Sequence, residues 1–126
     1  MNWKYKHTIF TPIYNRADQI ENVYKSLLES KYNLEWIEWV IIDDGSTDDL
    51  KSKIDQWKKS PFDIRYIRKE NGGIHTAQNR AIMEARGEFI TRIDSDDTIH
   101  PEALDRMDKW IEYLKNEVGG VHSLRT

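Results

Sequence analysis

Residues 36–50 read WIEWVIIDDGSTDDL and hold an apolar run, an acidic turn and the first residue of a helical pattern. The run WIEWVIID, at 36–43, is rich in β-branched and aromatic residues and ends in turn-forming ones, which is typical of a strand. From Leu50 onward, apolar residues recur three and four positions apart, which is typical of an amphipathic helix. The stretch therefore predicts a strand, a polar turn and a helix in succession.

The same succession recurs along the chain. Strands are predicted at 7–14, 36–43, 63–68 and 88–94, and helical patterns run over 20–28, 50–57, 77–85 and 104–114. Gly87 is expected to end the third helix, and Pro101 with Glu102 to open the fourth. Strands that alternate with helices call for right-handed crossovers between parallel strands. The predicted fold is therefore α/β, a Rossmann-like parallel sheet with helices on both faces.

The composition fits a single domain over residues 1–126 with a modest core. A net charge of −3 with both signs interspersed argues against nucleic-acid binding, which needs a basic surface. The chain has no cysteine, which excludes disulfide scaffolds and thiolate zinc sites and is compatible with the cytoplasm. Its longest apolar run, WVII at 39–42, is far too short to span a membrane, so no transmembrane segment is expected and any membrane association would be peripheral.

Polar clusters follow each of the predicted strands. They are TPIYNR at 11–16, DDGSTDD at 43–49, KENGGIH at 69–75 and DSDD at 94–97. Parallel sheets of this kind bind ligands outside the carboxyl ends of their strands, where loops and helix N-termini gather. Because all four clusters fall on that edge, the sequence predicts a ligand site there.

Three aspartates, Asp94, Asp96 and Asp97, crowd the end of the fourth strand. Carboxylates this close repel one another and need either open water or a cation. Mg²⁺ and Mn²⁺ prefer hard oxygen ligands, and Mg²⁺ commonly takes one or two carboxylates together with phosphate and water. The alternative interpretation is a solvated acidic turn that caps the following helix.

Asp43 and Asp44 follow the second strand, where an acidic residue can accept hydrogen bonds from a nucleoside. A turn with an N-cap explains Asp48 or Asp49 but does not explain Asp43 and Asp44 as well. Tyr14 ends the first strand, where its ring could stack on a base, although a lone tyrosine is more often a core residue.

Some competing motifs fail on their spacing. An EF-hand loop that began at Asp94 would need Gly at its sixth position and Glu at its twelfth, where Ile99 and Asp105 stand. The phosphate-loop and dinucleotide fingerprints are absent from the sequence. Asp94, Asp96 and Thr98 do fit the D-x-D-x-T pattern of haloacid-dehalogenase-like phosphatases, with Asp94 as nucleophile and Mg²⁺ between the acids.

Taken together, TPIYNR, VIIDDGSTDD, ENGG followed by AQNRAIMEARGEFI, and IDSDD resemble the N-terminal, nucleotide-sugar-binding half of family 2 glycosyltransferases, inverting enzymes of the GT-A fold. The resemblance covers roughly residues 7–115, and the four motifs occur in the family's order and spacing. It outweighs the phosphatase match, because that family's aspartate motif normally lies near the chain start.

The resemblance implies a role for each matching residue around a UDP-sugar. Tyr14 would stack on or flank the uracil, and the backbone near Thr11 and Pro12 would line the base pocket. Asp44 would hydrogen-bond the base edge, and Asp43 would support that loop.

The same resemblance implies that Asp96 lies near the ribose and diphosphate and that Asp96 or Asp97 ligates Mn²⁺ or Mg²⁺, with Asp94 as a further candidate ligand. Such a cation would stabilise negative charge on the leaving diphosphate. Arg92 departs from the family pattern, which usually has an apolar residue at this position of the fourth strand.

Family members continue into an acceptor-binding half with the carboxylate that deprotonates the acceptor hydroxyl, so the catalytic base is expected beyond Thr126. Glu112 and Glu117 are not assigned to that role. The resemblance implies a carbohydrate or lipid-linked acceptor and polysaccharide biosynthesis. A catalytically silent nucleotide-binding module remains the alternative, and self-association into a homo-oligomer is a further expectation.

Overall fold

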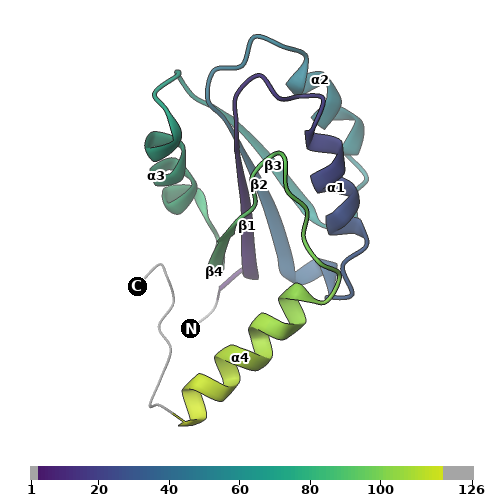
Figure 1. Ribbon diagram of the computed structural model, residues 1–126, viewed down its shortest axis with the longest axis vertical. Coiled ribbons are helices and arrows are strands. Elements are labelled where there is room, and N and C mark those ends of the chain that lie inside the picture. Colours follow the sequence, from purple (N-terminus) through teal and green to yellow (C-terminus); the bar gives the residue numbers. More distant parts are fainter. Residues whose placement is uncertain (1–2, 118–126) are drawn as a thin grey trace.

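The computed structural model describes residues 3–117. The strands are β1 (Tyr5–Ile13), β2 (Ile37–Asp43), β3 (Asp63–Arg68) and β4 (Gly87–Arg92). The α-helices are α1 (Ile20–Leu28), α2 (Leu50–Ile54), α3 (Ile74–Glu84) and α4 (Ala103–Glu117), and short 3₁₀ turns, η1 (Leu34–Trp36) and η2 (Asp55–Trp57), precede β2 and extend α2. All strand pairs are parallel, in the order β3-β2-β1-β4 (Figure 1). The predicted α/β, Rossmann-like sheet is confirmed.

Helices cover both faces of the sheet, as predicted. Figure 1 shows α1 and α2 on one side of the strands and α3 on the other. The larger core lies against α1, α2 and the start of α4, and it includes Ile9, Trp39, Ile41, Ile20, Leu27, Leu50 and Leu104. The smaller core lies under α3 and consists of Phe10, Val40, Ile42, Ala77 and Ala81. The period of two along β1 and β2 separates these sets, because successive strand side chains point to opposite faces.

A buried histidine fixes α4 at the amino ends of the strands. His7 of β1 is fully buried, and its Nε2 atom lies 2.7 Å from Oδ1 of Asp108 on α4. The Tyr32 hydroxyl donates to the other oxygen of Asp108 at 2.5 Å. Burial lowers the pKa of His7 below its usual value, although the hydrogen bond to Asp108 acts in the opposite direction. The contact between His7 and Asp108 therefore joins the sheet to α4.

A buried carboxylate fixes the other face at the same end of the sheet. Glu38 of β2 is fully buried and accepts hydrogen bonds from the Thr8 hydroxyl at 2.6 Å and from the Arg86 amide at 2.6 Å. Nε of Arg65 donates to its second oxygen at 3.1 Å. These donors come from β1, β3 and the segment before β4, so Glu38 ties the sheet together away from its carboxyl edge.

The predicted end of the third helix is wrong. Helix α3 ends at Glu84, and Gly87 is the first residue of β4 instead of the end of the helix. A Cβ atom on Gly87 would lie 2.6 Å from the backbone nitrogen of Thr8, so the close approach of β1 requires glycine here. Within residues 3–117, no helix combines the length and apolarity needed to cross a bilayer.

Candidate functional site

The loops that follow β1 and β2 are bonded to each other at the carboxyl edge. Asn15, which has a positive φ of 51°, donates its amide to the Ser46 hydroxyl at 2.9 Å. Its side-chain oxygen accepts from the Thr47 amide at 2.8 Å. Backbone bonds continue the sheet into the loops, from Asp44 to Ile13 and from Lys69 to Asp43. Three of the four predicted polar clusters are therefore joined by hydrogen bonds.

Asp44 is buried at the centre of this junction. Its Oδ1 atom accepts from Lys69 Nζ at 2.6 Å and from the Gly72 amide at 3.0 Å, and its Oδ2 atom accepts from the Gly73 amide at 3.0 Å. Burial by itself would raise the pKa of Asp44, but these hydrogen bonds outweigh it and hold the pKa below its usual value. A carboxylate has about four acceptor positions, so Oδ2 keeps one for a further donor.

Asp43 accepts hydrogen bonds from the loop after β2 and from β3. It is buried, and its Oδ1 atom accepts from the Ser46 amide at 2.8 Å. Its Oδ2 atom accepts from the Tyr66 hydroxyl and from Arg68 Nη1, the latter at 3.3 Å. Burial, followed by the hydrogen bond to Asp43, raises the pKa of Tyr66 to about 12. Asp43 therefore holds the loop after β2 through Oδ1 and contacts β3 through Oδ2.

The three candidates from the end of β1 differ in orientation. The Thr11 side chain is fully buried, and its hydroxyl accepts a hydrogen bond from Trp39 Nε1 at 2.9 Å. Only the backbone of Thr11 is thus available to the edge. Pro12 lines a cavity at the edge, and the Tyr14 side chain is about half exposed, at 49%. Part of Tyr14 is therefore accessible beside the loop that carries Asp44.

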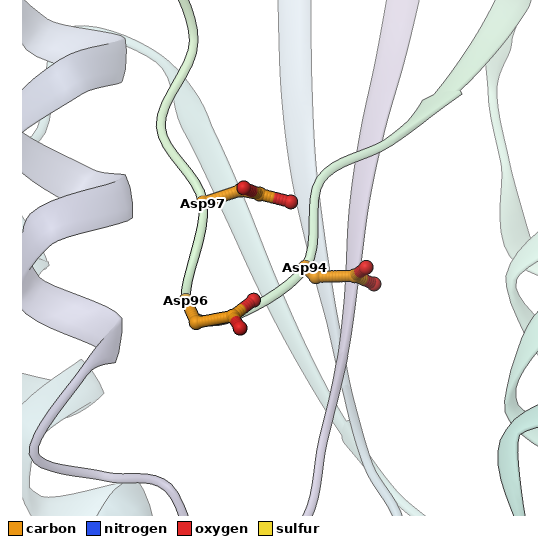
Figure 2. A group of neighbouring side chains, drawn as sticks. All are labelled: Asp94, Asp96 and Asp97. Atoms are coloured by element: carbon orange, nitrogen blue, oxygen red, sulfur yellow. The ribbon is translucent and has the colours of Figure 1, made fainter.

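The acidic cluster forms one compact turn after β4. Asp94, Asp96 and Asp97 each offer a carboxylate oxygen, and these oxygens lie within 4.8 Å of one another. Figure 2 shows the three side chains leaving the same loop in the same general direction. The Asp97 amide donates to the Asp94 carbonyl at 3.0 Å, which closes the turn. A set of hard oxygen donors at this spacing fits Mg²⁺ or Mn²⁺.

Arginines stand beside these acids. Arg92, the last residue of β4, donates from Nε to Asp94 Oδ1 at 2.7 Å and from Nη2 to Oδ2 at 3.3 Å. A cavity of about 270 Å³ adjoins the turn. It is lined by Pro12, Arg16, Gln19, Ile74, Arg92, Asp94, Ser95 and Asp96. A hollow that carries both guanidinium and carboxylate groups suits an anion together with a cation.

Two residues of the site were not singled out in the sequence. Lys69 lies in the KENGG segment and Arg16 in TPIYNR, so both motifs were noted but these cations were not assigned a role. Their charge was the available signal, because a lysine or arginine inside a motif at the carboxyl edge can bind an acidic residue or a phosphate. The partner that Lys69 meets, Asp44, comes from a loop 25 positions away in the sequence.

The chain is similar in sequence to known glycosyltransferases. Residues 8–122 match the model of the family described as Glycosyl transferase family 2. The putative teichuronic acid biosynthesis glycosyltransferase TuaG of Bacillus subtilis is 33% identical over 114 residues, which is 90% of this chain and 43% of TuaG. The chondroitin synthase of Pasteurella multocida is 34% identical over 110 residues, 87% of this chain and 11% of that protein. The chain spans less than half the length of these curated relatives.

Solved structures of glycosyltransferases are also similar to this chain. TarS 1-349 of S. aureus, in complex with UDP-GlcNAc, superposes with a TM-score of 0.79 at 28% identity, covering 85% of this chain and 31% of that one. The mannosyltransferase PcManGT of Pyrobaculum calidifontis, in complex with GDP-Man and Mn²⁺, has a TM-score of 0.78 at 25% identity, covering 88% of this chain and 36% of that one.

Proposed function

The chain belongs to glycosyl transferase family 2, and from this membership we propose that it is a donor-binding domain that takes a UDP-sugar and a divalent cation for inverting glycosyl transfer. The family and the GT-A fold were both expected from the four motifs and are confirmed. The observation that carries the proposal is that Asp44, with one acceptor position left, shares the carboxyl edge with the cluster of Asp94, Asp96 and Asp97.

The base would be held between Tyr14 and Asp44. Uracil carries an N–H donor between two carbonyl oxygens, so the remaining acceptor position on Asp44 Oδ2 suits that donor. Lys69, already 2.6 Å from Asp44, is a cation beside the same edge. The exposed Tyr14 ring supplies a stacking surface, worth about 1–3 kcal/mol for a base. Asp43 and the backbone of Thr11 and Pro12 would shape the pocket.

The diphosphate would lie over the acidic turn. Asp96 and Asp97 would hold Mn²⁺ or Mg²⁺, and Asp94 is the third carboxylate of the cluster. When bound, such a cation stabilises the charge that grows on the leaving diphosphate. Arg16 lines the cavity next to Asp96 and could bind phosphate oxygens through its guanidinium group. PcManGT, solved with GDP-Man and Mn²⁺, supports a metal in this fold.

The acceptor is proposed to be a carbohydrate or lipid-linked carbohydrate in polysaccharide biosynthesis, which the names of TuaG and chondroitin synthase support. The base that deprotonates the acceptor is proposed to lie outside residues 1–126, in an acceptor-binding half. A cytoplasmic location, peripheral to the membrane, is part of the same proposal, and self-association stays a prediction. The phosphatase alternative is not favoured, because residues 8–122 match a glycosyltransferase family. In addition, Asp94, which would be the nucleophile of a phosphatase, forms an ion pair with Arg92.

Thermal-shift measurements with UDP, GDP and CDP, in the presence of Mn²⁺ or a chelator, test the proposal. A ligand at about 100 times its Kd should add roughly 2.7 kcal/mol to the free energy of unfolding. We expect stabilisation by UDP with Mn²⁺ and a much smaller effect with chelator. Asp97→Asn and Asp96→Asn should each remove the Mn²⁺ dependence, whereas Asp55→Asn, an exposed acid on η2, should not.

The possible outcomes separate the parts of the proposal. Stabilisation by GDP in preference to UDP would disprove uracil as the nucleobase of the donor. Guanine is the rival nucleobase because PcManGT was solved with GDP-Man. The absence of any nucleotide effect would disprove donor binding altogether. Nucleotide binding that leads to no release of sugar from a UDP-sugar, even with the acceptor-binding half of a relative supplied, would favour the silent module.

A further inference from the structure

We infer that Arg92 sets the number of carboxylates available to the divalent cation, because it holds Asp94 in an ion pair and leaves Asp96 and Asp97 as the ligands. The inference rests on the metal site of the proposed function. It concerns a residue at which the sequence departs from its family and to which that function gives no role.

The geometry is that of a specific pair. Nε of Arg92 donates to Oδ1 of Asp94 at 2.7 Å, and Nη2 donates to Oδ2 at 3.3 Å. Such two-point binding fixes the plane of the carboxylate, which a lysine could not do. The two side chains are 39% and 40% exposed, so the pair stands at the surface of the site and is not a core element.

The position of Arg92 holds the guanidinium in place. Arg92 pairs with Phe10 of β1 in the sheet register and lines a cavity of about 470 Å³ on the α3 face with Phe10, Ile82 and Ile90. It also lines the smaller cavity that contains Asp94 and Asp96. An arginine can lay its aliphatic stem along apolar side chains while its charged head stays in water. Arg92 therefore extends from the apolar wall to the acidic turn.

The ion pair between Arg92 and Asp94 changes the negative charge of the acidic turn. Three carboxylates within 4.8 Å of one another repel, and Mg²⁺ commonly uses only one or two of them. Arg92 neutralises Asp94, so the turn presents the charge of two carboxylates. The alternative role for Arg92 is to bind the donor diphosphate directly. In that case the loss of Arg92 would weaken UDP binding and would leave the affinity for Mn²⁺ without nucleotide unchanged.

The test is the Kd for Mn²⁺ without nucleotide, measured from the EPR signal of free Mn²⁺ at fixed ionic strength. Arg92→Met is expected to bind Mn²⁺ about five-fold more tightly, the size of effect expected from removing one nearby positive charge in a solvent-exposed site. The double variant Arg92→Met/Asp94→Asn removes a neutral pair and should stay within about two-fold of the wild-type Kd. Asp97→Asn should lose about ten-fold or more.

Arg80→Met is the matched control. Nε of Arg80 lies 2.9 Å from Glu84, and its side chain is 40% exposed, which closely resembles the Arg92 pair. Its Kd for Mn²⁺ should not change, and circular dichroism should show that all variants are folded. The inference is overturned if Arg92→Met binds Mn²⁺ no more tightly than wild type, or if the double variant loses as much affinity as Asp97→Asn. Failure of the wild-type protein to bind Mn²⁺ at all would instead overturn the metal site itself, and the inference with it.

Discussion

The Nζ atom of Lys69 lies 2.6 Å from Oδ1 of Asp44, so an ion pair joins the loop after β3 to the loop after β2. Both side chains are largely buried, with 13% and 10% exposure, and the Gly72 and Gly73 amides complete the contact. This pair fixes the carboxylate that we propose to contact the base. We therefore expect the stability of the protein to depend on pH, and both its stability and its UDP affinity to depend on Lys69.

Lys69→Met should lower the free energy of unfolding by about 1–3 kcal/mol, because a largely buried carboxylate loses its only cationic partner among the described residues. It should also weaken UDP binding, since Asp44 is then held only by the two glycine amides. Urea denaturation and UDP titration measure these effects. Lys51→Met removes an exposed cation 3.1 Å from Asp55 and should change neither quantity noticeably.

The lowered pKa of Asp44 predicts a loss of stability in acid. Because the folded-state pKa is below the unfolded value, the stabilisation is present above the unfolded pKa and is lost as the pH falls through the folded one. The difference in unfolding free energy between wild type and Asp44→Asn should therefore be constant near neutral pH and shrink in the acid range. A difference that grows on acidification would contradict the assigned network.

Tyr14→Ala should weaken UDP binding by about 1–3 kcal/mol and leave stability nearly unchanged, because the ring is about half exposed and is proposed to stack on the base. Calorimetric titration gives the affinity. Tyr113→Ala, on α4, removes a ring of similar exposure and should not affect UDP. Equal effects of the two substitutions would argue against a base at Tyr14.

His7 predicts a second pH dependence, at higher pH than that of Asp44. Burial lowers its folded-state pKa below the unfolded value, so the folded protein binds fewer protons. The free energy of unfolding should therefore be independent of this group above the unfolded pKa and should fall as the pH drops from there toward the folded pKa. Urea denaturation of wild type and His7→Gln over this range should show their difference shrinking as the pH is lowered.

Glu38→Ala should destabilise the protein by about 3–5 kcal/mol, because it leaves Arg65, the Thr8 hydroxyl and the Arg86 amide without their buried acceptor. Since Glu38 lies away from the carboxyl edge, the UDP affinity of the folded variant should stay close to wild type. Glu38→Gln keeps one acceptor oxygen and should cost less. A loss of UDP affinity without a loss of stability would show that Glu38 affects the site directly.

Much of the site's location could be predicted from the order of elements. In a parallel sheet every strand ends at the same edge, so DDGSTDD and DSDD had to lie on one edge once the strands were recognised. Gly87 shows where local signals fail, because a glycine after a helical pattern resembles a helix end. Its actual role, to let β1 approach β4, depends on a residue 79 positions away.

The sequence by itself determined the alternation of strands and helices, the parallel sheet and the edge at which the polar residues collect, because these follow from periodicity and from the reach of short crossovers. Only the tertiary structure decided that the Thr11 hydroxyl faces Trp39, that Asp44 has one acceptor position left and that Arg92 forms an ion pair with Asp94. The physical reason is that the direction of a side chain and the partner it meets depend on strand register and on loops packed from distant segments, which no local pattern encodes.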